Sequence, residues 1–262
     1  PYTTLFRSIL FCLVDIYLLI ELWRAPVTLT SSTNSVTTST SLKAEMKSDN
    51  ITVPSLSRKG DSGYYLATRS KSDLKEAAKK LSSDVSTSYA EGDKTLYATM
   101  KTAIPLERMT VGEFKNDSNY VPHGKQYVYA KNLSSNSSYV YVQKSQYGLV
   151  YSNLAQLVVN VKNKKIMGYY QTYLTDLSSV RELQATISPL RAVTNLYTTR
   201  ELADNSRVMQ VKLGYTKLTE VRGSVIFVPT WLVWIENKSS KSSSRKPFSV
   251  PETDRSANLP PR

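Results

Sequence analysis

The sequence has one histidine, one cysteine and nine scattered glycines among its 262 residues. A histidine-based metal cluster is therefore excluded, and a Ser-His-Asp triad would depend wholly on His123. Cys12 is the sole thiol, so the chain contains no internal disulfide and no thiolate cluster. The glycines form no phosphate-binding loop. A Ser/Lys dyad is not excluded by counting, but both residue types are too abundant to single out a pair. We expect no catalytic residue, no metal and no cofactor.

Long apolar runs are also scarce, and the one present lies at the N-terminus, at Ile9–Trp23. Extended upstream through Leu5 and Phe6, a helix of these residues has roughly the length of the hydrocarbon core at about 1.5 Å per residue. We therefore expect residues 9–25 to be a transmembrane anchor that tethers a folded ectodomain.

Two acids interrupt this apolar run. An aspartate at the centre of a membrane helix costs about 2.5–3.5 kcal/mol on insertion scales, whereas Glu21 is near one end and can snorkel. Asp15, flanked by Tyr17, predicts a contact with another membrane helix, with Glu21 as a further candidate contact. The alternative is that Asp15 is tolerated in a tilted helix whose outer end is anchored at the interface by Trp23 and Arg24.

A signal peptide is the competing interpretation of the N-terminus. Asp15 within the apolar region and the lack of a small-x-small cleavage site near Trp23–Pro26 both disfavour it. Residues 1–8 do not begin with Met and look like the translation of a sequencing-adapter read, so we expect them to be an artefact.

The formal net charge is +13, with a pI near 9.6. A cationic surface attracts polyanions. For a domain outside the membrane we expect no nucleic acid as a partner, and the available polyanions are lipid headgroups or anionic wall polymers. The alternative is that the charge serves only solubility.

Composition divides the rest of the chain. Residues 26–41 are rich in Ser and Thr and predict a flexible tether without a fold. We expect a first α+β module at 42–131, a boundary or long hairpin at 132–138, a second α+β module at 139–236, and a disordered or misassembled tail at 237–262. The fold class predicted is α+β, with antiparallel sheets packed by helices.

Several elements can be located by pattern. Helices are predicted after Ser72, with an apolar stripe from Leu74 to Leu81, and from Ser188-Pro189 to about Leu202. Residues 104–124 look irregular. Pro229 implies that the last predicted strand is an edge strand or is bulged. The other predicted strands are 64–67, 95–100, 127–129, 139–142, 149–151, 156–161, 166–173, 208–218 and 225–235. A hairpin turn is predicted at Lys162–Lys164, between strands 156–161 and 166–173.

Tyrosines recur in pairs, at Tyr127 and Tyr129, at Tyr139 and Tyr141, and at Tyr169-Tyr170. Such pairs can stack on sugars or bind peptides. The alternative is that they are half-buried strand residues with a structural role.

A collinear set of segments resembles the YycI family of low-GC Gram-positive bacteria. These segments are Leu13–Leu18, Asp49–Leu56, Gly63–Leu66, Gln171–Leu174, the helix Ile187–Leu202, Val211–Tyr215 and Phe227–Glu236.

The resemblance implies a cytoplasmic N-terminus, one membrane pass, and an extracellular domain related to YycI/YycH and PepSY-like modules. It also implies a non-enzymatic role in cell-wall homeostasis: together with a YycH-like protein, such chains regulate the sensor histidine kinase WalK (YycG), and the membrane helix contacts the kinase. The rival functions are a cationic adaptor that binds wall polymer or lipid and, with less support, an exported hydrolase.

Overall fold

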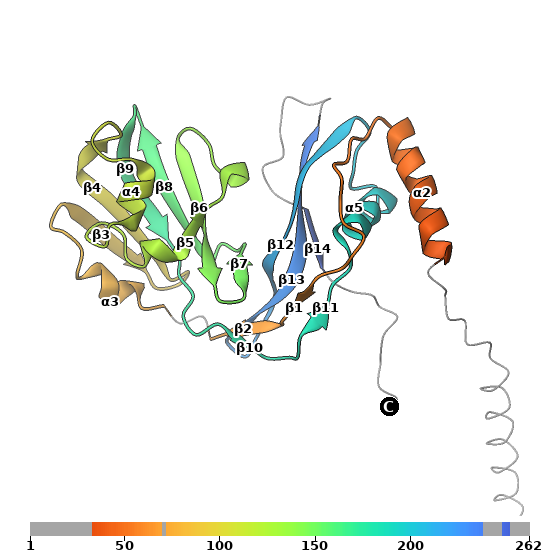
Figure 1. Ribbon diagram of the computed structural model, residues 1–262. Coiled ribbons are helices and arrows are strands. Elements are labelled where there is room, and N and C mark those ends of the chain that lie inside the picture. The colour runs from red at the N-terminus through yellow and green to blue at the C-terminus, as the bar shows by residue number, and fades with distance from the viewer. Residues whose placement is uncertain (1–32, 70–71, 238–247, 252–262) are drawn as a thin grey trace, which may run out of the picture. The chain divides into compact units, whose positions relative to one another are not determined.

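The structure is a computed structural model (Figure 1), and it describes residues 33–69, 72–237 and 248–251. The chain divides into two compact units, residues 1–45 and 46–262. Helix α2 (Thr33–Ser48) crosses this division. The sequence predicted an unstructured tether up to residue 41, which is wrong for residues 33–41, because they are helical. Their role as a tether remains a prediction.

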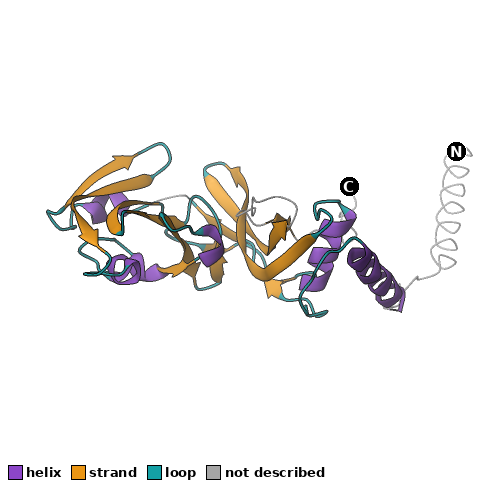
Figure 2. Ribbon diagram, turned by 90° about the horizontal axis from the view of Figure 1, so that it is seen from above, coloured by secondary structure: helices purple, strands orange, loops and turns teal. Residues whose placement is uncertain are grey.

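Strands are the main regular secondary structure of the second unit (Figure 2), and within the described residues they form one twelve-stranded and one two-stranded sheet. The large sheet runs in the order β10-β2-β13-β12-β7-β6-β8-β9-β4-β3, with β14 paired to β13 and β5 paired to β6. The strands are β1 (Ser62–Gly63), β2 (Leu66–Thr68), β3 (Val85–Ala90), β4 (Thr95–Pro105), β5 (Tyr127–Tyr129), β6 (Ser138–Ser145), β7 (Gly148–Val150), β8 (Gln156–Lys162), β9 (Lys165–Gln171), β10 (Ser178–Ser179), β11 (Gln184–Ala185), β12 (Ser206–Val221), β13 (Ser224–Asn237) and β14 (Phe248–Pro251).

The predicted α+β class is confirmed, with a mostly antiparallel sheet and few helices. Strand pairing crosses the predicted boundary at 132–138. Strand β4 from the first predicted module pairs with β9 from the second, and β2 pairs with β13. The division into modules at 42–131 and 139–236 remains a prediction, but the hydrogen bonds of the sheet do not follow it.

One core lies against strands β3, β4, β9, β8 and β6, and it includes Leu74 of α3 (Leu74–Ala78) and Phe114 of α4 (Val111–Asn116). The hairpin turn between β8 and β9 was predicted at Lys162–Lys164. It is confirmed, and Asn163 and Lys164 adopt the positive φ angles that tight hairpins require.

Two helix predictions need correction here. Helix α3 is shorter than its apolar stripe, and its N-cap position is Asp73, whereas the hydroxyl of Ser72 accepts the backbone N–H of Leu74 at 3.3 Å. Residues 104–124 were predicted to be irregular, but they contain α4, and the short 3-10 helix η1 (Gly124–Gln126) begins at their last residue. Strand β3 was also missed.

A second core lies between the β12-β13 hairpin and α5 (Pro189–Thr198). The N-cap prediction is confirmed, because the Ser188 hydroxyl accepts the N–H of Arg191 at 3.2 Å. Pro229 does not mark an edge strand, since β13 has neighbours on both sides. It lies between the residues paired to β2 and those paired to β14. The bulges lie in β12 instead, at Met209 and Leu218.

The tail at 237–262 was predicted to be disordered, but residues 248–251 form β14 against β13. The remaining residues after 237, together with the predicted anchor at 9–25 and the predicted artefact at 1–8, lie outside the described residues.

Candidate functional site

All five site residues predicted from sequence, Asp15, Tyr17, Glu21, Trp23 and Arg24, lie outside the described residues. Their roles as an intramembrane contact and an interfacial anchor remain predictions. Among residues 33–69, 72–237 and 248–251, no helix has the length and apolarity needed to cross a bilayer. The same ranges contain no cluster of three metal-ligating side chains.

The most distinctive surface feature of the described chain comes from two Tyr-Val-Tyr segments, residues 127–129 in β5 and 139–141 in β6. Alternate residues of a strand share a face, so Tyr139 and Tyr141 project to the same side of β6. The antiparallel register places Tyr129 directly opposite Tyr141, on that same face. The ring centroid of Tyr129 lies 5.3 Å from that of Tyr141 and 6.2 Å from that of Tyr139.

Helix α4 forms the opposite wall. Its start is fixed by a capping box, in which the N–H of Glu113 donates to the Thr110 hydroxyl at 3.2 Å and the N–H of Thr110 donates to the Glu113 carboxylate at 2.8 Å. The Glu113 carboxylate accepts the N–H of Thr110 and also its hydroxyl, at 2.8 Å each, and these two hydrogen bonds hold the pKa of Glu113 below its ordinary value. Phe114, which is fully buried, ties the helix to the core, and Val111 faces the tyrosines.

Lys115, on the same helix, is only 8% exposed. Its ammonium donates to the carbonyl oxygen of Tyr127 at 2.9 Å and lies 5.6 Å from the centre of the Tyr141 ring, within cation–π range. No carboxylate of the described chain pairs with it. Burial lowers the pKa of Lys115. The lysine therefore holds β5 and the Tyr141 ring in place from below.

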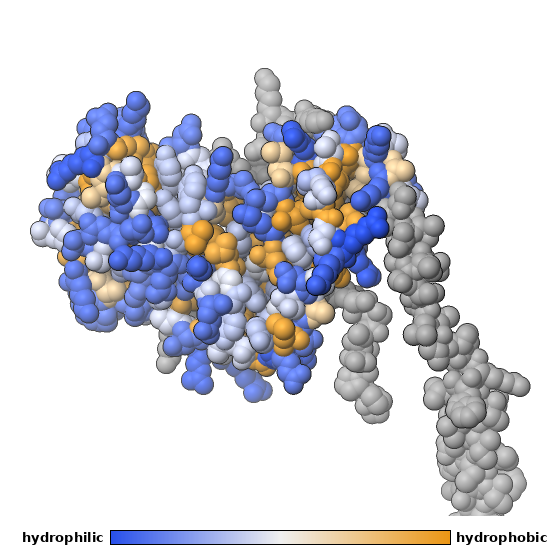
Figure 3. All heavy atoms as spheres, in the orientation of Figure 1, coloured by the Kyte–Doolittle hydropathy of each residue, from blue (hydrophilic) through white to orange (hydrophobic). Residues whose placement is uncertain are grey.

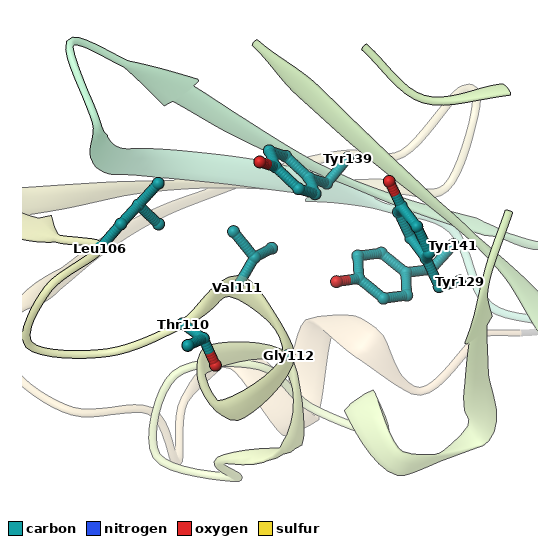
Figure 4. A pocket seen from close by; sticks show the side chains of 7 residues that line it. All are labelled: Leu106, Thr110, Val111, Gly112, Tyr129, Tyr139 and Tyr141. Carbon is teal, nitrogen blue, oxygen red and sulfur yellow. The ribbon is translucent and has the colours of Figure 1, made fainter. Parts of the chain in front are cut away.

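The tyrosines and the start of α4 line an open groove of about 350 Å³, which we call the aromatic groove. Figure 4 shows the three tyrosine rings gathered around one side of it, with Leu106 on the other side and Val111 between them. Tyr129 is 46% exposed, whereas Tyr141 is buried. The groove is lined by Leu106, Thr110, Val111, Gly112, Tyr129, Tyr139 and Tyr141.

His123 takes part in a different cluster. Its Nε2 lies 3.0 Å from an Asp73 carboxylate oxygen, and its ring stacks on Tyr173 at a centroid distance of 4.3 Å. The Tyr173 hydroxyl in turn donates to the side-chain oxygen of Gln126 at 2.6 Å. The imidazole is thus held between two segments of the fold, which suits a structural role.

The sequence pattern pointed to the tyrosine pairs, but it did not predict helix α4 or the role of Lys115, which complete the groove. The signal for α4 was available, because Thr110-Val-Gly-Glu113 matches the capping-box pattern. Lys115 carried no such signal. It resembles any surface lysine until the helix phase places it on the same side as Val111.

The comparisons with known proteins identify the family. The model of the YycI protein family matches residues 29–248, which is most of the chain. The chain belongs to the YycI family. This family consists of non-catalytic, membrane-associated regulators, and membership implies a protein associated with the sensor kinase WalK (YycG) and with YycH.

No curated protein sequence matches the chain. The solved structures that are similar include two at 12% identity, each matched over 76% of this chain. One is an uncharacterized protein from Eubacterium rectale, matched over 84% of its length with a TM-score of 0.40. The other is YycH from Bacillus subtilis, matched over 54% of its length with a TM-score of 0.46.

Proposed function

We propose that this chain regulates a WalK-type sensor histidine kinase by direct contact at two levels, within the membrane through residues 9–25 and outside it through the folded domain. The family match over residues 29–248 is the observation that carries the proposal. Such a regulator needs no chemistry of its own. It needs only to bind one signalling conformation of the kinase more tightly than the other, and about 1–3 kcal/mol of difference changes the balance 5- to 150-fold.

The membrane contact is assigned to Asp15, with Tyr17 and Glu21 beside it. A carboxyl group in hydrocarbon lacks hydrogen-bond partners unless a neighbouring helix supplies them. We propose that a kinase helix does so, while Trp23 and Arg24 hold the outer end of the anchor at the interface.

The ectodomain contact is assigned to β12, whose two bulges support it. Each bulge has an extra apolar residue at its centre, Met209 in one and Leu218 in the other, and these side chains are 52% and 54% exposed. Bulges turn side chains away from the regular face of a strand and are frequent at functional sites. Val221, at the end of the same strand, is 53% exposed as well. We propose that these side chains meet the kinase sensor domain or a YycH-like protein.

Co-purification of the full chain with the kinase from membranes tests both contacts separately. Asp15→Leu combined with Glu21→Leu removes the intramembrane acids, and Cys12→Leu is the matched control in the same segment. Leu218→Lys combined with Met209→Lys tests the bulges, with Met167→Lys on β9, 39% exposed, as its control. We expect kinase recovery to fall with each test pair and to be unchanged in each control. Unchanged recovery and unchanged signalling in both test pairs would contradict the proposal.

The net charge of +13 favours a second candidate, a cationic adaptor that holds anionic wall polymer or lipid at the outer face of the membrane. Its binding would be lost with modest salt, because screening weakens contacts between exposed charges. Salt-sensitive retention on wall polymer in cells lacking the kinase would favour it over kinase regulation.

A further inference from the structure

The tyrosines of the aromatic groove differ from the core tyrosines in their hydrogen bonding. The hydroxyl of Tyr127 donates to the Thr172 carbonyl, and that of Tyr169 donates to the Tyr120 carbonyl at 2.8 Å. In the described chain the hydroxyls of Tyr129, Tyr139 and Tyr141 have no such protein partner, although all three line the cavity. The groove therefore offers three polar tips on rigid aromatic rings to a ligand.

The groove carries no charged side chain in its lining. The two charged side chains that follow Gly112 on α4 are occupied elsewhere, since Glu113 is held by the capping box and Lys115 by the Tyr127 carbonyl. In a chain with a net charge of +13, a neutral groove is unsuited to the polyanions that the rest of the surface attracts. A groove with a neutral lining suits an uncharged ligand.

The shape and chemistry of the lining narrow the class further. A volume of about 350 Å³ is at the small end of ligand sites, which span about 300–1,000 Å³. Aromatic faces carry partial negative charge, so they attract the weakly positive C–H face of a sugar ring. A pyranose also carries equatorial hydroxyls around that face, which match the unpartnered tyrosine hydroxyls.

We propose that the aromatic groove binds a neutral pyranose unit of a glycan, stacked on Tyr129 and Tyr139, with the tyrosine hydroxyls as hydrogen-bond partners. An extended peptide fits less well. Peptides captured by sheets pair with a free strand edge, whereas the groove opens on the face of β5 and β6 under α4. This inference does not depend on the proposed kinase contacts.

The test uses the full chain in lipid nanodiscs and the neutral tetrasaccharide of N-acetylglucosamine as the probe, with binding followed by saturation-transfer NMR and calorimetry. Tyr129→Ala removes the most exposed ring, and Tyr97→Ala is the matched control. Both tyrosines are 46% exposed, both lie on strands and both contact another tyrosine, but Tyr97 is on β4 outside the groove. Thermal melting monitors the fold of each variant.

We expect the wild type to bind the tetrasaccharide, Tyr129→Ala to lose about tenfold or more in affinity, and Tyr97→Ala to bind normally. Tyr129→Phe should fall between wild type and Tyr129→Ala, because it keeps the ring and loses one hydroxyl. Absence of binding by the wild type, or equal loss in Tyr97→Ala, would overturn the proposal. So would binding only of a stem peptide or of a polyglycerol phosphate chain. Co-purification of the kinase with Tyr129→Ala from membranes is measured as well. It shows whether the kinase contact of the proposed function is kept when the glycan site is lost.

Discussion

Tyr215 and Val150 are paired in parallel, and among the described residues theirs is the one register match between β12 and β7. The adjacent N–H of Tyr151 donates to the Tyr215 carbonyl at 2.7 Å. Through this pairing the β12-β13 hairpin and the antiparallel strands around β6 belong to one sheet. The Tyr215 side chain also reaches the residue that follows β1, where its hydroxyl accepts the N–H of Tyr64 at 3.3 Å.

The Tyr215 hydroxyl gives a first prediction. Tyr215→Phe keeps the ring in its buried place but leaves the Tyr64 N–H without its partner, so we expect a loss of about 0.5–1.5 kcal/mol in the free energy of unfolding. Denaturant unfolding measures it. The Tyr139 hydroxyl has no protein partner in the described chain, so Tyr139→Phe should lower the free energy of unfolding by much less. Equal losses in the two variants would contradict the account.

A second prediction concerns the capping box of α4. Thr110→Ala removes the hydroxyl that accepts the Glu113 N–H, and we expect a loss of about 1 kcal/mol. Thr110→Ser keeps the acceptor and should retain most of the stability. In the wild type, the cap stabilises the fold above the ordinary pKa of glutamate and loses its effect as pH falls through the lowered pKa of Glu113. Acid unfolding midpoints that do not differ between wild type and Thr110→Ala would argue against this role.

A third prediction concerns Gly168, because β9 approaches β4 closely at this residue. Its φ of +154° is rare for other residues, and a Cβ there would lie 2.2 Å from the Ala98 carbonyl oxygen. Gly168→Ala should therefore cost about 2 kcal/mol or more. Gly92→Ala is the matched control, since nothing lies within 4 Å of its added Cβ. The thermal midpoints of the two variants should separate clearly.

A fourth prediction concerns alkaline pH. Burial raises the pKa of Tyr141 to about 12, above the value of about 10 in an unfolded chain. Below pH 10 the phenol is neutral in both the folded and the unfolded state, so its contribution to the free energy of unfolding is fully present. Between pH 10 and 12 the unfolded state loses the proton first, and stability falls by up to about 1.4 kcal/mol per pH unit. Tyr141→Phe should flatten this decline and remove one late phenolate from the absorbance titration at 295 nm; an unchanged titration would refute it.

Lys115 acts in the opposite direction and at lower pH, below its ordinary pKa. Because burial lowers its pKa, the folded state releases a proton before the unfolded state does, and stability rises with pH up to the unfolded value of about 10.4. Lys115→Met removes this rise, so we expect the variant to be more stable relative to wild type at neutral pH than at pH 10. Urea unfolding at the two pH values measures the difference. If the difference in free energy of unfolding between Lys115→Met and wild type did not change with pH, the lowered pKa of a buried Lys115 ammonium would be contradicted.

The sequence predicted well where a local pattern decides the structure. The Ser188-Pro189 start of α5 and the Lys162–Lys164 turn depend on neighbouring residues alone, and both are confirmed. Long-range pairing is where it failed. Nothing local states that β4 pairs with β9 across residues 106–164, or that Pro229 lies in an interior strand where the pairing passes from β2 to β14.

The candidate site was partly predictable for the same reason. The alternation in Tyr-Val-Tyr places its tyrosines on one face, and this much follows from the strand period. The register that sets Tyr129 opposite Tyr141, and the helix that covers them, depend on contacts between distant segments.

Regulation of the kinase by contact is tested most directly by reconstitution. The full chain and the WalK-type kinase are incorporated into the same lipid vesicles, and the rate of kinase autophosphorylation is measured with and without the chain. The account predicts a rate that changes when the wild-type chain is present, and a change that is reduced by Asp15→Leu with Glu21→Leu but retained by Cys12→Leu. An autophosphorylation rate that is the same with and without the wild-type chain would contradict it.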